Sequence, residues 1–308
     1  MALTKGTFVR HPSDEVHKEK LGFGIVVEDE KNASAAIFFE KRGSASNVKT
    51  DVINYLVVDA PKEARLFLEN ALCQSNGDRQ PFPQVVERFL TRFKGGLVGA
   101  VYLSGERHYK IEAHELASHL LSKESFSTRV AKEEWQELSA DIKKVFTINL
   151  LSKFELIKLS DALKDEFGQK EVCHCFYELL YAEKSISSRI QKAEKILANY
   201  ELNTWPVISY LLFIVFPEQY MFVKPTMTKE AAKNRGFDIQ YDSQVNGVTY
   251  QKVLDFSQDI FNRLIDDPRD ELRPRDMIDI QGFMWCTFAN GWTDEAIQQF
   301  ESELAVVT

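Results

Sequence analysis

The sequence lacks the features that mark secreted and membrane proteins. Its four cysteines in 308 residues are too few and too scattered for a disulfide framework, and MALTKGTFVRHPSD shows no signal-peptide pattern. The most apolar run, residues 205–222, is interrupted by Pro206 and Pro217, which leaves ten residues between them. A membrane span needs about 20 apolar residues. We therefore expect a cytoplasmic protein with a buried helix here and no membrane partner.

The motifs of the common enzyme classes are missing too. We find no P-loop, dinucleotide fingerprint, nucleophile elbow or metalloprotease helix. Cys173-His174-Cys175 suggests a metal site at first sight, but on a helix positions 173 and 175 point about 200° apart. Neither Cys73 nor Cys286 adds a second ligand pair at short spacing. We expect buried thiols, no metal and no cofactor.

An excess of positive charge is also absent. The chain carries 46 acidic and 38 basic residues, a net charge of -8. This balance opposes nonspecific attachment to a phosphate backbone, although a local basic groove stays possible. What the chain has in quantity is aromatic residues, at 12% of the composition, and they predict a well-filled core.

The first sixth of the chain differs from the rest. Residues 6–58 alternate short runs of Val, Ile and Phe with Gly, Asn and Asp, which predicts four or five strands. From Pro61 onward the apolar residues recur with helical spacing. We predict an α+β, mostly α fold, with a small SH3-like β barrel in residues 1–60 and a helical domain in residues 61–308.

Helix ends are marked by proline, glycine and short polar residues. Helices are expected at 61–72, 81–93, 106–123, 131–151, 154–167, 171–183 and 185–200. Further along, the predicted N-caps are Thr228, Thr249, Asp276 and Thr293, and Gly236 is a predicted stop.

The N-terminal pattern resembles a known kind of barrel. It carries the glycines and apolar residues of a "V.HP…G.G.V…..V.F…G" arrangement: Gly6, Val9, His11, Pro12, Gly22, Gly24, Val26, Ala36, Phe38, Phe39 and Gly43. This resembles the SH3-like or Tudor-like barrels of bacterial CarD-type transcription factors and of some DNA helicase termini. The resemblance implies a docking module for a protein or a nucleic acid.

The helical region is similar to a class of uncharacterised bacterial proteins. Three stretches carry the similarity: 93–96 with 106–114, 216–250, and 275–285. No reaction is established for this class, so the similarity implies related proteins and indicates no chemical activity.

Lys110 and His114 form the first candidate site. They are four residues apart, so a helix places them on one face, beside Tyr109 and Glu106. Lys110 is then a candidate amine nucleophile or phosphate contact, and His114 a proton shuttle. The alternative is an ordinary helix surface with a partly buried imidazole.

Two further candidate sites stand at predicted helix starts. Lys224 is followed by the hydroxyls of Thr226 and Thr228, a pattern that favours an anion site at a helix N-terminus. The alternative is an ordinary loop lysine beside a routine helix cap. Asp279 lies three residues after the predicted cap Asp276, and it is either a capping partner or a catalytic carboxylate.

These residues support three hypotheses about function. The favoured one is a nucleic-acid-associated bacterial protein, with the barrel as docking module and the helical domain as DNA-recognition body; it requires Lys110, Lys224, Arg235 and Arg275 on one concave face.

The second is a DNA-processing enzyme of glycosylase or lyase type, acting on a base or sugar of modified or phage DNA. It would stack a base on Tyr109, Tyr220, Phe222 or Trp285, with Lys110, Lys224 and Asp279 at the sugar. The third is an adaptor that binds proteins, in part through the barrel. Residues 3–48 carry seven basic and seven acidic residues, so protein and DNA are equally plausible partners there.

Overall fold

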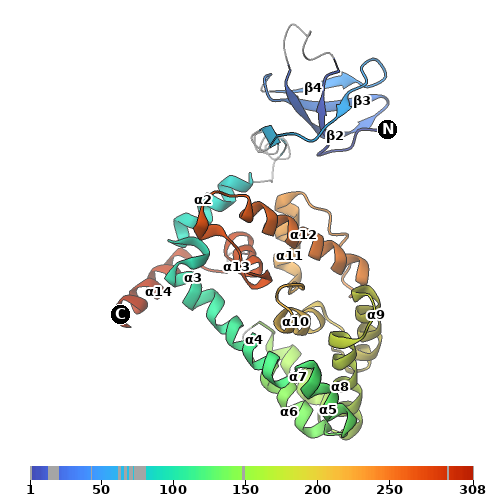
Figure 1. The fold of residues 1–308 in the computed structure, drawn as a ribbon, viewed down its shortest axis with the longest axis vertical. Helices are drawn as coiled ribbons and strands as arrows, with labels where there is room; N and C mark the ends of the chain where they lie inside the picture. The colour runs from blue at the N-terminus through green and yellow to red at the C-terminus, as the bar shows by residue number, and fades with distance from the viewer. Residues whose placement is uncertain are drawn as a thin grey trace. The chain divides into compact units, whose positions relative to one another are not determined.

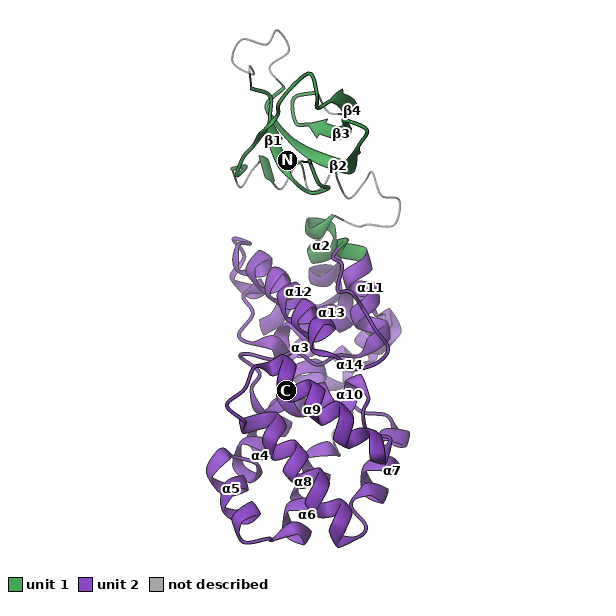
Figure 2. Ribbon diagram, turned by 90° about the vertical axis from the view of Figure 1, so that its right-hand side faces the viewer, with its two compact units in different colours: residues 1–86, 234–236 green, residues 87–233, 237–308 purple. Residues whose placement is uncertain are grey.

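The computed structural model describes residues 2–12, 21–42, 44–61, 64–65, 68, 72, 81–147, 150–289 and 291–307. It divides into two compact units (Figure 2): residues 1–86 with 234–236, and residues 87–233 with 237–308. The first contains the strands and the second most of the helices. The predicted α+β, mostly α fold is confirmed.

Five antiparallel strands form the sheet of the first unit (Figure 1). They are β1 (Phe8–Arg10), β2 (Phe23–Lys31), β3 (Ser34–Phe39), β4 (Ser44–Lys49) and β5 (Leu56–Val57), in the order β4-β3-β2-β1-β5. The sheet is open, because β4 and β5 are its two edges and no pairing joins them among the described residues. A closed barrel, as predicted, is therefore not what these strands form.

The hairpin between β2 and β3 shows why the sheet has this register. Asn32 and Ala33 both have positive φ, 51° and 56°, as a two-residue type I′ turn requires. Lys31 then pairs with Ser34, and alternate residues of β3 point into the core. Phe39 lies in that core beside Tyr55, while Phe38 packs on the opposite face, so these aromatic side chains fill the unit rather than line an open groove.

The helices have the following bounds: α2 (Phe82–Arg92), α3 (Ala100–Tyr102), α4 (His108–Leu120), α5 (Lys123–Ala131), α6 (Trp135–Phe146), α7 (Lys153–Ala162), α8 (Glu166–Tyr181), α9 (Ile186–Leu197), α10 (Trp205–Val215), α11 (Pro225–Arg235), α12 (Gly247–Ile265), α13 (Met277–Phe288) and α14 (Asp294–Val307). Three 3-10 turns and one π-helical turn, η2 (Leu103–Arg107), complete the set among the described residues. The helix predicted over residues 61–72 lies largely outside them.

Two predicted caps are wrong. Helix α11 begins at Pro225, a favoured first position, so Thr228 lies inside it. Helix α12 is capped by Asn246, whose side chain accepts a hydrogen bond from the Thr249 N–H at 2.9 Å. The Thr249 hydroxyl instead donates to the Gln240 carbonyl. Asp276 and Thr293 do accept the expected hydrogen bonds.

Helix α10 is the apolar centre of the helical unit, as the proline-bounded run predicted. It contacts α4, α8 and α9, and every residue after Pro206 is buried. Its Ser209 hydroxyl accepts a hydrogen bond from the Val223 N–H at 2.8 Å, and the Tyr250 hydroxyl donates to the Met221 carbonyl at 3.0 Å. These bonds fix the extended segment that leads to Lys224. None of the described helices is both long and apolar enough to cross a membrane.

The packing of α10 predicts a large mutational effect. Leu211→Ala should lower the free energy of unfolding by about 2–5 kcal/mol, because it leaves a cavity around a fully buried position. Urea denaturation followed by circular dichroism measures the change. Ile157→Ala, on the exposed face of α7, is the control and should leave the midpoint nearly unchanged. Equal midpoints for both variants would contradict the central role of α10.

Candidate functional site

A pocket of about 560 Å³ lies in the helical unit, a size typical of sites for small ligands. Its lining combines aromatic rings with charged and amide side chains: Gly105, Glu106, Tyr109, Glu112, Leu150, Lys224, Gln281, Trp285, Gly291 and Trp292. They come from the π-helical turn η2, from α4 and α13, and from the segments before α7, α11 and α14. Residues more than 180 positions apart in sequence thus share one cavity.

The π-helical turn η2 forms one wall. Such turns are rare and are frequent at functional sites, because the extra residue redirects the side chains around it. Here Gly105 and Glu106 face the pocket. A Cβ on Gly105 would lie 2.6 Å from the Trp292 ring, so only glycine lets this indole lie against the backbone.

Glu106 and Lys110 form a buried ion pair at the pocket wall. They are four residues apart, and both side chains are almost fully buried. The second carboxylate oxygen of Glu106 accepts a hydrogen bond from the Trp292 Nε1–H at 3.0 Å. Burial, followed by the charge of Glu106 and a hydrogen bond to it, raises the pKa of Tyr109, which therefore stays a neutral phenol. Since the amine of Lys110 is held by a carboxylate, it is poorly placed to act as a free nucleophile.

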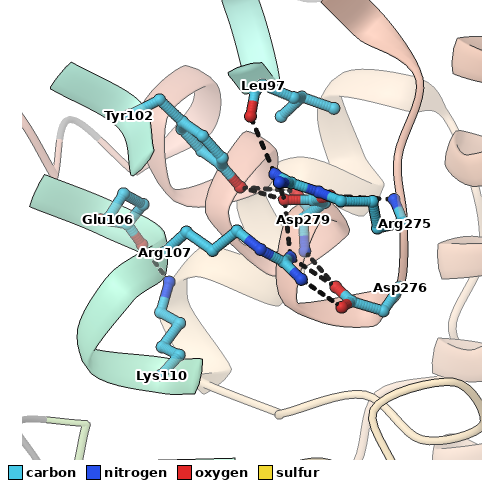
Figure 3. Close-up of polar contacts among 8 residues, drawn as sticks. All are labelled: Leu97, Tyr102, Glu106, Arg107, Lys110, Arg275, Asp276 and Asp279. Atoms are coloured by element: carbon cyan, nitrogen blue, oxygen red, sulfur yellow. Dashed lines mark hydrogen bonds and ion pairs between the residues drawn. The ribbon is translucent and has the colours of Figure 1, made fainter. Parts of the chain in front are cut away.

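Asp279 is the centre of a second network beside this pair (Figure 3). Its carboxylate is fully buried and lies 2.9 Å from Arg107 Nη1 and 2.8 Å from Arg275 Nε. The Tyr102 hydroxyl donates to it at 3.1 Å. Arg107 also binds both oxygens of Asp276, at 2.8 and 2.6 Å. The carboxylate of Asp279 is thus occupied on both oxygens, and the network fixes α13 against η2.

Lys224 differs from the other cations near the pocket. Its Nζ lies 4.3 Å from the centre of the Trp285 ring, and no carboxylate among the described residues is within ion-pair distance. Burial is the largest influence and lowers the pKa of Lys224; the charges of Glu155 and Glu106 oppose it, and the charge of Lys110 adds to it. Lys224 therefore directs toward the pocket an amine that has no carboxylate partner among the described residues.

Gln281 supplies an unsatisfied polar atom. The residue is 2% exposed and lines the pocket, yet its Oε1 has no hydrogen-bond partner among the residues that the structure describes. Its Nε2 lies 3.8 Å from the Met227 sulfur. An unpaired buried acceptor costs about 1–3 kcal/mol. A ligand that donates a hydrogen bond to it would recover that energy.

Of the predicted site residues, Tyr109, Lys224 and Trp285 line this pocket together, and Lys110 lies at its wall in the pair with Glu106. His114 does not join them. Its Nδ1–H donates to the Ile214 carbonyl at 2.7 Å, which ties α4 to α10. His114 is not among the residues that line the pocket, so the proton-shuttle role predicted for it stays a prediction.

The remaining predicted residues have other positions. Phe222 is fully buried among Tyr210 and Phe213, and it offers no surface on which a base could stack. The Tyr220 hydroxyl accepts a hydrogen bond from Arg189 at 2.5 Å.

The predicted anion site is not assembled either. Thr226 is exposed, whereas Thr228 is buried inside α11. Arg275 binds Asp279 and the Leu97 carbonyl. Arg235 belongs to the other compact unit, where it lies over the Phe82 ring.

Sequence reasoning missed several lining residues, among them the polar or aromatic side chains of Gln281, Trp292 and Glu112. Gln281 had a usable signal, because it precedes Trp285 by four positions and a helix places both on one face. Trp292 stands directly before the predicted cap Thr293, and nothing local indicates that its ring turns back to Glu106.

The cysteines of the described residues are buried and free. Cys173 and Cys175 have different neighbours, Ser139 and Ala193, and burial raises the pKa of their thiols to about 11 and about 12. No group of three or more metal-ligating side chains is found in the parts of the chain that the structure describes.

Comparison with known proteins does not name a relative. No protein-family model matches the chain, and no curated protein or solved structure matches it significantly. The resemblances of residues 6–58 to CarD-type and helicase barrels, and of the helical region to uncharacterised bacterial proteins, therefore stay predictions. Function has to be inferred from the chemistry of the pocket.

The Asp279 network predicts a stability effect. Asp279→Asn should lower the free energy of unfolding by about 3–5 kcal/mol, because it leaves two arginines without their shared buried carboxylate. Chemical denaturation measures the difference. Asp270→Asn, in an exposed pair with Arg273, is the matched control and should unfold like the parent protein. A parent-like Asp279→Asn variant would show that the network does not hold α13.

Proposed function

We propose that the helical unit binds a nucleobase in this pocket, as part of a nucleic-acid-associated role. The observation that carries the proposal is the combination of Trp285, Trp292 and Tyr109 with the unpaired amide oxygen of Gln281 in one cavity. Proteins that bind an extruded or single-stranded base use aromatic side chains for its faces and polar groups for its edge. The pocket offers both kinds of contact.

The polar groups favour a base that donates hydrogen bonds. Gln281 presents an acceptor without a partner, and the exposed Glu112 is a second acceptor on the lining. Adenine, cytosine and guanine each carry an amino group at an edge, whereas thymine does not. We infer a preference for bases with an exocyclic amino group.

The charges favour recognition of a base over recognition of a phosphate backbone. Backbone binding requires several free lysines or arginines on one surface. Lys110, Arg107 and Arg275 are all bound to carboxylates, which leaves Lys224 as the pocket cation without one among the described residues. The net charge of -8 repels a phosphate backbone, whereas it does not oppose binding of an uncharged planar base.

A protein partner for the N-terminal β unit is a separate proposal. Its support is the edge strand β5, where Leu56 and Val57 are 51% and 61% exposed. Exposed apolar edge strands are sites at which another chain can pair.

Tryptophan fluorescence tests base binding. Adenosine, cytidine, guanosine and thymidine, and single-stranded oligonucleotides of one base each, should quench the emission of the full chain, thymine least. Trp285→Ala and Trp292→Ala should weaken binding about 5- to 150-fold, the equivalent of losing one stacking contact of about 1–3 kcal/mol. Isothermal calorimetry replaces fluorescence for these two variants.

Phe154→Ala provides the matched control, because this exposed aromatic residue lies on α7 outside the pocket lining. Its affinity should equal that of the parent protein. Gln281→Met should weaken the preference for amino-bearing bases, because it removes the acceptor while nearly keeping the packing volume. Absence of binding by every base, or equal losses in Phe154→Ala, would refute the proposal.

A further inference from the structure

Two lysines lie at the pocket, and only one has its amine available. Lys110 Nζ is fully buried and is directed at the carboxylate of Glu106. Lys224 Nζ faces the pocket, has no carboxylate within ion-pair distance among the described residues, and rests on the Trp285 ring. An amine acts as a nucleophile only when it is free of such a partner.

We propose that Lys224 forms an imine with an aldehyde carried by a nucleotide bound in the pocket. This inference rests on the proposed function and names the chemical class of its substrate. The aldehyde has two possible sources: a formyl group on the base itself, or the ring-opened sugar of an abasic nucleotide. Both present a carbonyl carbon to the same amine, and the experiment below separates them.

The position of Lys224 suits such a step. The segment before it is fixed by the Val223 hydrogen bond to Ser209 and by the Met221 carbonyl, so the Lys224 side chain starts from a defined point. Its stem is partly buried and its amine lies 4.3 Å from the centre of an indole that also lines the pocket. A group held against that indole is within reach of the amine.

The charge state supports the same reading. Burial lowers the pKa of Lys224; the charges of Glu155 and Glu106 oppose this and that of Lys110 adds to it, and the net direction is downward, which raises the neutral fraction of the amine. The indole face attracts the ammonium form and acts in the opposite direction. Because the carbonyl consumes only neutral amine, deprotonation of further ammonium replenishes it as the reaction proceeds.

The step balances without any oxidant or reductant. The nitrogen lone pair attacks the carbonyl carbon, the C–O π electrons move to oxygen, and a proton passes from nitrogen to that oxygen. The carbinolamine then loses water: its C–O bond breaks, the C=N bond forms, and the remaining N–H proton goes to the departing hydroxide. Amine and aldehyde become imine and water, and hydrolysis reverses the step.

Reductive trapping tests the inference on the full chain. The protein is incubated with sodium cyanoborohydride and one of three single-stranded oligonucleotides: one with a 5-formylcytosine, one with an abasic site, and one unmodified. We expect a covalent adduct, seen as a gel shift, with one or both aldehyde strands and none with the unmodified strand. The strand that reacts identifies the source of the aldehyde, and peptide mass mapping should place the adduct on Lys224.

Variants make the test specific. Lys224→Arg keeps a cation over Trp285 and should lose the adduct. Lys224→Gln is the second variant, with an uncharged side chain that is shorter than arginine, and it should lose the adduct too. Lys229→Arg, an exposed lysine on α11, is the matched control and should form the adduct as the parent does. An adduct that persists in both Lys224 variants, or that maps to other lysines, overturns the inference, as does the absence of any adduct.

Failure of this inference is distinguishable from failure of the proposed function. Quenching by unmodified nucleosides requires no covalent step. If nucleosides bind and no aldehyde strand is trapped, base binding stands and the imine is refuted. If neither binding nor trapping occurs, both are refuted.

Discussion

The pocket depends on one buried interaction: Arg107 and Arg275 both form ion pairs with the Asp279 carboxylate. Arg107 ends the π-helical turn and Asp279 lies in the first turn of α13, so their contact sets the distance between the two walls. Buried charges of this kind add little net stability when they are well paired. What they add here is position, because an apolar contact would allow α13 to slide or rotate against η2.

The polar residues at the pocket fall into two sets. In the closed set, the Asp279 network and the Glu106–Lys110 pair bond to one another, so these groups are not available to a ligand. In the open set, the Lys224 amine has no carboxylate partner and the Gln281 Oε1 has no hydrogen-bond donor among the described residues, and both residues line the same cavity. Closed sets build a rigid wall, and open groups carry recognition.

The sequence predicted what is local and missed what is tertiary. The mostly α fold, the strand-rich front and the Asp276 cap follow from short patterns, and all are present in the structure. The Thr228 cap failed because Pro225 offers an earlier start three residues upstream. Tyr109, Lys224 and Trp285 were chosen by residue type, but only packing could show that they share a cavity while Phe222 lies in the core.

The π-helical turn has an evolutionary consequence. It holds one residue more than an α-helical turn of the same span, and each residue of an α-helix turns the chain by about 100°. A single codon gained or lost between positions 103 and 107 would swing the preceding helix through that angle relative to α4. A chain without this residue would keep the neighbouring helices and lose the arrangement of Gly105 and Glu106, so a one-residue deletion here would reshape the pocket wall in a way that a single substitution does not.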